Sequence, residues 1–127
     1  MAKTLQVIES AYRGTIEEQD DTIIWLTHAM KGQGADLDVL LKGNAVNYAV
    51  KGQDASGLQF GGRKQTQPPR LADDVAKLTE KGIGVYIVQD DVRSRGIDKS
   101  DLIDGLKPVP SADVARLFAG YDRIWHW

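Results

Sequence analysis

The chain has 127 residues, of which 42% are apolar and 27% are charged, and its formal net charge is −2. This length suffices for one hydrophobic core, so we expect a single domain over residues 1–127. The small net charge argues against nucleic acid or a membrane as partner. The absence of cysteine excludes disulfides, thiolate metal sites and a cysteine nucleophile.

The opening residues give no targeting signal. Met1–Lys3 leads directly into strand-like sequence, without the cationic and apolar regions of a secretion signal. No apolar run approaches the roughly 20 residues that a membrane-spanning helix needs. We therefore expect a cytoplasmic protein.

Strand and helix patterns alternate from the start of the chain. Thr4–Glu9 is predicted to be a strand, followed by a turn that contains Tyr12 and Gly14. The acidic run Glu17–Asp21 suits the start of a helix, and either Asp20 or Asp21 suits its N-cap. The predicted helix is Thr22–Gly32; the side chains expected to form its buried stripe are Ile23, Leu26, Thr27 and Met30.

The next unit repeats this order. Asp36–Leu41 is predicted to be a second strand, and Lys42–Asn44 a tight turn into a short helix over Ala45–Val50 that Gly52 ends. Gln53–Pro69 contains glycines and a proline pair that interrupt any periodicity. We interpret it as a long surface loop that serves as a lid or an assembly contact.

The second half of the chain contains the stretch on which the functional interpretation depends. A helix is predicted over Arg70–Lys81, and then a buried parallel strand over Gly84–Val88 that leads into a charged turn. One or two helical turns are predicted over Lys99–Gly105, and extended chain over Leu106–Pro110.

The chain closes with a helix and a strand. The helix starts near Ser111 with Val114, Leu117 and Phe118 on one face, and Tyr121–Trp127 alternates as a strand does. Alternating strands and helices predict a three-layer α/β/α sandwich around a mostly parallel five-stranded sheet.

Charged residues gather after the Gly84–Val88 strand, where ligands of open α/β sheets bind. Asp90, Asp91, Arg93 and Arg95 are the members of this group. In one interpretation they form a polar pocket whose arginines hold an anion. In the other they cap the next turn and pair with each other, at about 0–1 kcal/mol for each surface pair.

Other candidate sites give weaker signals. Lys42–Ala45 could cradle an anion with its backbone amides, and Gly61–Lys64 resembles a phosphate loop only superficially. His28 is expected on the surface, and with His126 it makes no catalytic triad or zinc set. Trp125 and Trp127 are expected in core or subunit packing.

The order of several motifs resembles the DsrE/DsrF/DsrH superfamily, whose Tus counterparts relay sulfur for tRNA thiolation. The motifs are the opening strand with its tyrosine-containing turn, the segment Leu41–Ala49 followed by Lys51–Gln53, and Gly84–Ile87 leading to Arg95–Gly96. Tyr86–Gly96 and the terminal tryptophan are closest to the DsrH/TusB branch. The length and the opening half are closer to the DsrE/TusD branch.

The resemblance implies oligomers of like or related subunits and, in active DsrE-type members, a persulfide-carrying cysteine at the end of the central strand. Counting back from Arg95–Gly96, that position falls on Val88, within a residue. Valine cannot form a persulfide. We therefore expect no catalytic residue of that kind, no metal and no cofactor.

Two hypotheses follow. The preferred one is a non-catalytic subunit that assembles with itself or with related DsrE-, DsrF-, DsrH- or TusA-like proteins. The alternative is a small-molecule or nucleotide-binding module, or an enzyme that uses Asp90, Asp91, Arg93 and Tyr12. The side chains expected to bind a ligand are Tyr12, Asn44, Gln89, Asp90, Arg93 and Arg95.

Overall fold

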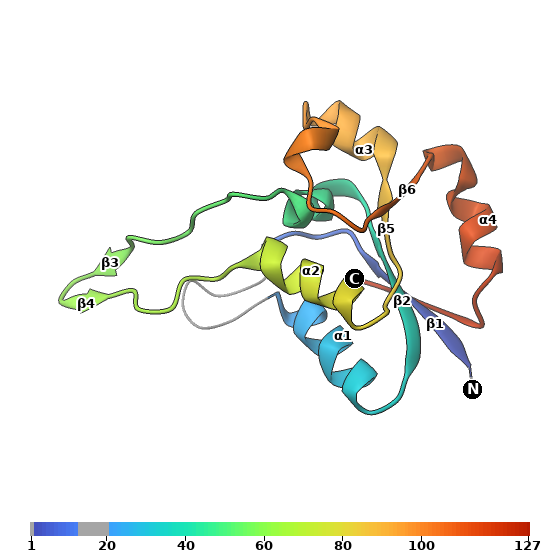
Figure 1. Cartoon of the computed structure of the whole chain (residues 1–127), viewed down its shortest axis with the longest axis horizontal. Coiled ribbons are helices and arrows are strands. Elements are labelled where there is room, and N and C mark those ends of the chain that lie inside the picture. Colours follow the sequence, from blue (N-terminus) through green and yellow to red (C-terminus); the bar gives the residue numbers. More distant parts are fainter. Residues whose placement is uncertain (1, 13–20) are drawn as a thin grey trace.

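A computed structural model describes residues 2–12 and 21–127 (Figure 1). The centre of the fold is a five-stranded sheet in the order β6-β5-β2-β1-β7, and every neighbouring pair in it is parallel. Its strands are β1 (Lys3–Ile8), β2 (Asp36–Leu41), β5 (Val85–Val88), β6 (Lys107–Val109) and β7 (Arg123–His126). The predicted α/β sandwich with a mostly parallel five-stranded sheet is confirmed.

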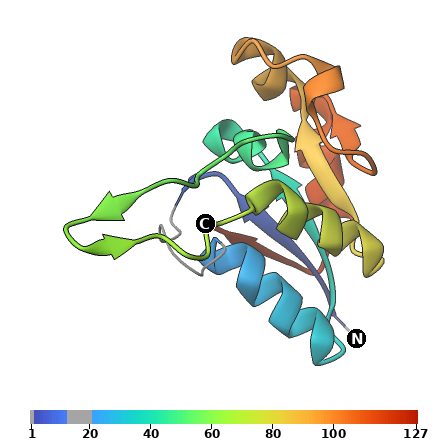
Figure 2. The ribbon, with the colours of Figure 1, turned by 60° about the vertical axis from the view of Figure 1, so that its left-hand side comes forward.

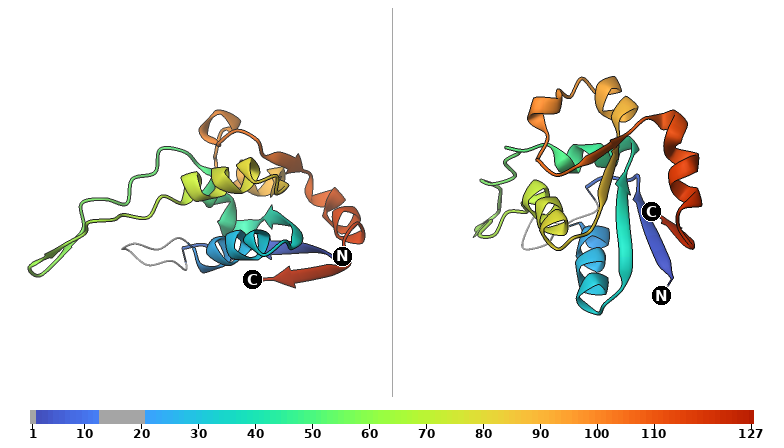
Figure 3. Two further views of the ribbon diagram at one scale, coloured as in Figure 1. Left: turned by 60° about the horizontal axis from the view of Figure 1, so that its bottom comes forward. Right: turned by 45° about the vertical axis from the view of Figure 1, so that its right-hand side comes forward.

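Helices cover both faces of this sheet. The helical elements are α1 (Thr22–Gly32), η1 (Gly43–Ala49), α2 (Leu71–Glu80), α3 (Gln89–Ser94), η2 (Lys99–Asp101), η3 (Ser111–Asp113) and α4 (Val114–Ala119). Side chains of α1, η1, α2 and α3 pack on one face, whereas α4 packs on the opposite face (Figure 3).

The larger core lies beneath α1, η1, α2 and α3. Strands β1 and β2 are buried on both faces, which explains why they are nearly continuous apolar runs rather than alternating ones. Tyr48 of η1 is fully buried in this core. Its hydroxyl donates to Asp21 Oδ2 at 2.6 Å and accepts a hydrogen bond from the Tyr12 backbone N–H.

Helix α1 has the bounds that the sequence predicts. Asp21 is its N-cap, and Oδ1 of this buried carboxylate accepts hydrogen bonds from the N–H groups of Ile23 and Ile24. Gly14, Asp20 and the rest of the acidic run before it lie outside the described residues.

The smaller core lies beneath α4. Val114, Leu117 and Phe118 pack against a buried set on the sheet, which confirms the predicted apolar face of the last helix. The buried set is Leu5, Val7, Leu40 and Val88.

The local structure differs in detail from the prediction at three places. Gln89–Ser94 is the helix α3 instead of a charged turn, because its backbone continues directly from β5 into helical hydrogen bonds. Gln53–Pro69 contains an antiparallel hairpin, β3 (Gln59–Phe60) and β4 (Arg63–Lys64), with its turn at Gly61 and Gly62. The helical structure expected over Lys99–Gly105 is confined to η2.

Two side-chain predictions also change. His28 is half-buried and bridges α1 to α2: its Nε2 lies 2.9 Å from the Asp74 carbonyl, and its Nδ1 lies 2.8 Å from Lys81 Nζ. Trp125 and Trp127 are 38% and 37% exposed, so of their two predicted roles the core of this chain is excluded, and subunit packing stays a prediction. Across the described ranges, no helix is long and apolar enough to cross a membrane.

Candidate functional site at the carboxyl edge of the sheet

The carboxyl ends of all five strands meet at one edge of the sheet. The chain leaves β1 through α1 on one face and reaches β7 through α4 on the other face. The order of the strands therefore changes direction at β1, between β2 and β7. Ligands of open α/β sheets bind at such a switch point.

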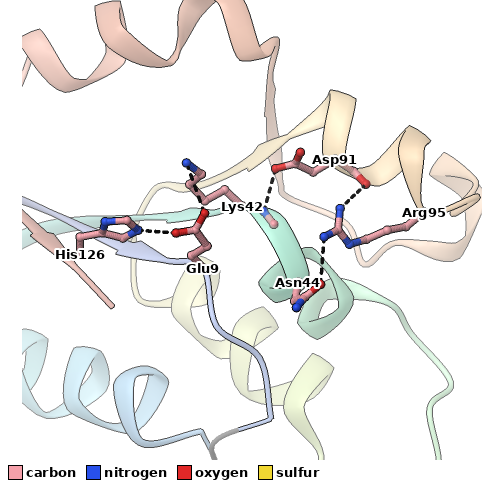
Figure 4. Close-up of polar contacts among 7 residues, drawn as sticks. Glu9, Lys42, Asn44, Asp91, Arg95 and His126 are labelled. Atoms are coloured by element: carbon pink, nitrogen blue, oxygen red, sulfur yellow. Dashed lines mark hydrogen bonds and ion pairs between the residues drawn. The ribbon is translucent and has the colours of Figure 1, made fainter.

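A carboxylate lies between two basic side chains at this point (Figure 4). Glu9 follows β1, Lys42 follows β2, and His126 is the last residue of β7. The Glu9 carboxylate lies 2.8 Å from His126 Nε2 and 3.6 Å from Lys42 Nζ. All three side chains reach solvent, so each pair contributes only about 0–1 kcal/mol to stability.

Gly43 lets the turn after β2 pack closely against Glu9 and Asp91. Its φ is +55°, and a Cβ there would lie 3.1 Å from Glu9 Cγ, so glycine fits this turn where a larger residue would be strained. Its N–H donates to Asp91 Oδ2 at 2.7 Å. The end of β1 and the start of α3 are thereby joined through one turn.

A second polar group lies beside that turn. Arg95 donates to Asn44 Oδ1 at 2.9 Å and to the Asp91 carbonyl at 3.3 Å (Figure 4). Asp90, the remaining acidic residue of α3, accepts the N–H of Ser111 at 2.9 Å and so fixes the approach to α4. Asp90 and Asp91 thus accept backbone N–H groups of neighbouring turns, and Arg95 contacts the backbone carbonyl of Asp91 rather than a carboxylate.

Val88 is the last residue of β5 and is only 2% exposed. It packs in the smaller core with Leu40 and Val7, beneath α4. The residue expected at the family's cysteine position therefore lies at a strand end, as the resemblance requires, but its side chain faces an apolar core. It presents no reactive group to solvent.

The predicted ligand-binding residues are not brought into one site. Gln89 and Arg93 line a cavity of about 430 Å³ between α3, η2 and β6. Asn44 and Arg95 belong to the polar group described above, and Asp90 caps Ser111. Tyr12 lines a separate cavity of about 450 Å³ at the start of α2.

Tyr12 has an unusual backbone. Its φ is +57°, and its phenol donates to Gln53 Oε1 at 2.8 Å. Partial burial raises the pKa of the Tyr12 phenol, and the hydrogen bond to Gln53 opposes that rise. A neutral phenol suits a role as an anchor for Gln53 better than a role as a base.

Glu9, Lys42 and His126 were missed as a group by sequence reasoning. Glu9 ends a predicted strand, Lys42 follows one, and His126 lies one residue before the end of a third; the ends of parallel strands meet at one edge. The missing information was the position of β7 beside β1, which sequence pattern does not give. Within residues 2–12 and 21–127, no three side chains of the types that bind metals gather closely enough to hold an ion.

The comparisons with known proteins concern the fold. No protein-family model matches the chain, and no curated protein matches it. Its structure is similar to the ychN protein from E. coli, with a TM-score of 0.75, 21% identity and all of both chains covered.

Two further solved structures are similar, and both are described as proteins of unknown function. MTH1491 from Methanobacterium thermoautotrophicum has a TM-score of 0.62 and 16% identity, with 98% of this chain and 99% of that chain covered. BT1422 from Bacteroides thetaiotaomicron has a TM-score of 0.67 and 12% identity, with 98% and 94% covered. The chain thus has the α/β fold with a parallel sheet that these proteins share.

Proposed function

We propose that this protein is a non-catalytic member of the DsrE-like class of sulfur-trafficking proteins. In this proposal, residues 1–127 form one such domain that works in the cytoplasm. It assembles with copies of itself or with cysteine-bearing DsrE-, DsrF-, DsrH- or TusA-like partners. The order of the family-like motifs and the fold shared with ychN support this class.

The observation that carries the proposal is that the strand β5 ends in the buried, apolar side chain of Val88. The chain has no cysteine, and the side chain at this position is buried and apolar. A persulfide relay needs an accessible thiolate, since the thiolate is the nucleophile. The scaffold is therefore suited to holding a partner rather than to carrying sulfur itself.

The carboxyl edge of the sheet offers a surface for such a partner. Lys42 and His126 are two basic groups on either side of the single carboxylate Glu9. The edge is held in place by the Gly43 and Asn44 contacts, so docking would require little rearrangement. Its basic residues suit an acidic patch or a bound persulfide anion on the partner.

Capture of purified partners tests the proposal. We expect immobilised protein to retain a cysteine-bearing DsrE-like or TusA-like protein, and to retain its cysteine-to-serine form equally well. Lys42→Glu should weaken capture about tenfold or more, whereas Lys77→Glu on the exposed side of α2 should not. A chain that captures neither partner and is strictly monomeric in light scattering would contradict the proposal.

A second candidate function is binding of a small anionic molecule. Its support is that Gln89 and Arg93 lie on the wall of the 430 Å³ cavity, a volume in the range of ligand pockets. A thermal shift with anionic ligands that is abolished by Arg93→Ala would favour it. The enzyme form of this hypothesis loses support, because Asp90, Asp91 and Tyr12 do not converge on that cavity.

A further inference from the structure

The two edges of the sheet differ in how they can receive another strand. β6 is one edge strand, and it contains Lys107 and Pro108, two residue types that protect an edge from pairing. β7 is the other edge strand; it contains neither lysine nor proline, and all of its side chains are exposed. An open edge with apolar and aromatic residues is a template for another strand, so β7 is the edge at which this sheet can be extended.

The outward-facing backbone groups of β7 belong to Ile124 and His126. In a parallel ladder, alternate residues of a strand bond to the same neighbour. The Trp127 N–H donates to the Val7 carbonyl of β1 at 2.9 Å, so Trp125 bonds to β1 as well. The N–H and C=O groups of Ile124 and His126 therefore point away from β1. In the described part of the chain, β1 is the only strand that pairs with β7 (Figure 2).

An antiparallel contact with a second copy can pair all of these backbone groups. A two-fold axis at Trp125 places Ile124 opposite His126 of the second copy. These two residues exchange two hydrogen bonds, and the axis repeats both bonds on its other side. A register shifted by two residues leaves Ile124 or His126 opposite a residue outside β7. The outer edge of β7 is thus complementary to itself in the register centred on Trp125.

Side chains favour the same register. Arg123, Trp125 and Trp127 alternate along the chain and lie on the face that α1 covers, where Trp127 bonds to Gln6. The axis places Trp125 opposite its own copy, and Arg123 opposite Trp127 of the second copy. Both are non-hydrogen-bonded pairs, in which opposed side chains are closest. An aromatic pair and a guanidinium over an indole ring each stabilise such a contact, and no two like charges are opposed.

The residues of this contact are available for a partner. Trp125 and Trp127 are large apolar side chains that remain partly exposed. Arg123 makes no ion pair with any described residue. The Trp127 ring is already fixed, because its indole N–H donates to the buried Gln6 at 2.7 Å. A fixed ring loses little side-chain freedom on association, which favours binding.

We propose that two copies of the chain pair through β7, antiparallel about a two-fold axis at Trp125, and so form one continuous sheet. This inference rests on the assembly role proposed above and names the contact between copies. The contact is isologous, so it closes at a dimer. Because the two β7 strands run in opposite directions, the carboxyl edges of the two sheets face opposite ways. Each copy can therefore hold its own partner at its own Glu9, Lys42 and His126.

Light scattering on the purified chain provides the first test. Ile124→Pro removes an outward N–H and leaves the hydrogen bonds to β1 in place. We expect a dimeric wild-type chain and a dissociation constant raised at least about tenfold by Ile124→Pro. Ile124→Val is the matched control, since it keeps the N–H, and it should remain dimeric. A monomeric wild-type chain, or a dimer that tolerates Ile124→Pro, would overturn the inference.

A charge exchange at the axis tests the register and does not depend on a proline variant that folds. Trp125→Glu and Trp125→Lys each place two like charges opposite each other, so each variant alone should be monomeric. A mixture of the two should form one-to-one heterodimers, because residue 125 then meets an opposite charge. A mixture that stays monomeric while both variants keep a native circular dichroism spectrum would contradict the register.

A single introduced thiol tests the same geometry covalently. The chain has no cysteine, so Trp125→Cys places its only thiol at the axis. Cα atoms of a non-hydrogen-bonded antiparallel pair are about 4.5 Å apart, within the range of about 4.4–6.8 Å found in disulfides. We expect mild oxidation to link this variant into dimers at least about tenfold faster than Trp25→Cys, which is exposed on α1. Equal rates would count against the axis at Trp125.

These experiments separate the inference from the proposed function. If Ile124→Pro is monomeric but still captures a cysteine-bearing partner, both stand. If the wild-type chain dimerises through β7 but captures no cysteine-bearing partner, the sulfur-trafficking role is wrong. If the dimer survives Ile124→Pro while capture persists, only the β7 contact is wrong. If the wild-type chain is monomeric and Ile124→Pro abolishes capture, β7 pairs with the partner instead of a second copy, and the inference is overturned.

Discussion

The side-chain amide of Gln6 accepts a hydrogen bond from the indole N–H of Trp127 at 2.7 Å. Gln6 is fully buried in β1, and its Nε2 lies 3.7 Å from Met30 Sδ of α1. The carbonyl of Trp127 also accepts the N–H groups of Glu9 and Ser10. One residue beyond β7 thus fixes the end of β1, from which Glu9 reaches the candidate site.

Trp127→Phe should destabilise the protein by about 1–3 kcal/mol, because it leaves the buried Gln6 oxygen without its donor. Urea unfolding followed by circular dichroism measures this cost. In the double variant with Gln6→Leu, the unsatisfied oxygen is gone, and the combined loss should be smaller than the sum of the two single losses. Simple additivity of the two substitutions would show that the hydrogen bond has no role.

Gly84→Ala should cost about 1–3 kcal/mol of stability through overpacking. A Cβ at Gly84 would lie 2.9 Å from Asp38 Oδ1, which is closer than the two atoms can approach. That oxygen cannot move freely, because it accepts the Gly84 N–H at 2.8 Å. Thermal or urea unfolding provides the measurement.

The matched control is Gly32→Ala at the end of α1. A Cβ there has no neighbour within 4 Å, so alanine should raise stability by about 0.5–1 kcal/mol through its better helix propensity. Equal effects of the two substitutions would mean that the contact with Asp38 is not responsible.

Tyr48→Phe should destabilise the protein by about 1–3 kcal/mol, since it removes a buried hydroxyl that donates to the Asp21 carboxylate capping α1. Tyr12→Phe removes the same atom from a residue that is 55% exposed and should cost less than about 0.5 kcal/mol. Chemical unfolding of the two variants side by side decides between them. A larger loss of unfolding free energy for Tyr12→Phe than for Tyr48→Phe would contradict the conclusion that the Tyr48 hydroxyl contributes more to stability.

The sequence predicts an element of the fold well where its residue pattern is compatible with only one type of secondary structure. Strands β1, β2 and β5 can be recognised in the sequence as apolar runs, because parallel strands are buried on both faces. Helix α1 can be recognised because Asp21, its N-cap, precedes apolar residues at helical spacing. The β3–β4 hairpin was missed because its strands have two residues each, too short for any periodicity.

The candidate site is harder to predict than the fold. Gln89–Ser94 contains charged residues in a pattern that a turn and a short helix share, so α3 was not expected. Glu9, Lys42 and His126 are far apart along the chain and meet only because β7 pairs with β1. Strand order is a property of long-range packing, which local sequence pattern does not encode.

Alkaline pH should weaken the contact between Tyr121 and Asp38. The phenol donates to Asp38 Oδ2 at 2.6 Å, and partial burial, followed by that hydrogen bond and the carboxylate charge, raises the pKa of Tyr121. The folded-state pKa is therefore above the value of about 10 in the unfolded chain. Its stabilisation is fully present below pH 10 or so and is lost as pH rises through the folded-state pKa.

Urea unfolding at pH 8 and pH 10.5 measures this loss. The wild-type chain should lose more stability between the two pH values than Tyr121→Phe does, since the remaining titrating groups are common to both. An equal loss in the two proteins would exclude Tyr121 as a contributor to the alkaline transition.

Val88→Cys should restore a thiol at the expected family position without restoring reactivity. Val88 is 2% exposed and packs with Leu40 beneath α4, so the new thiol would lie in an apolar core. Burial there raises the pKa of a thiol and keeps reagents away, which leaves little reactive thiolate.

We expect slow alkylation of Val88→Cys by iodoacetamide in the folded protein and rapid alkylation in urea. Ser94→Cys, on the exposed end of α3, is the control that should react quickly in both states. Rapid alkylation of the folded Val88→Cys variant would mean that the strand end is open to solvent, and the proposal of a closed, non-catalytic strand end would have to be withdrawn.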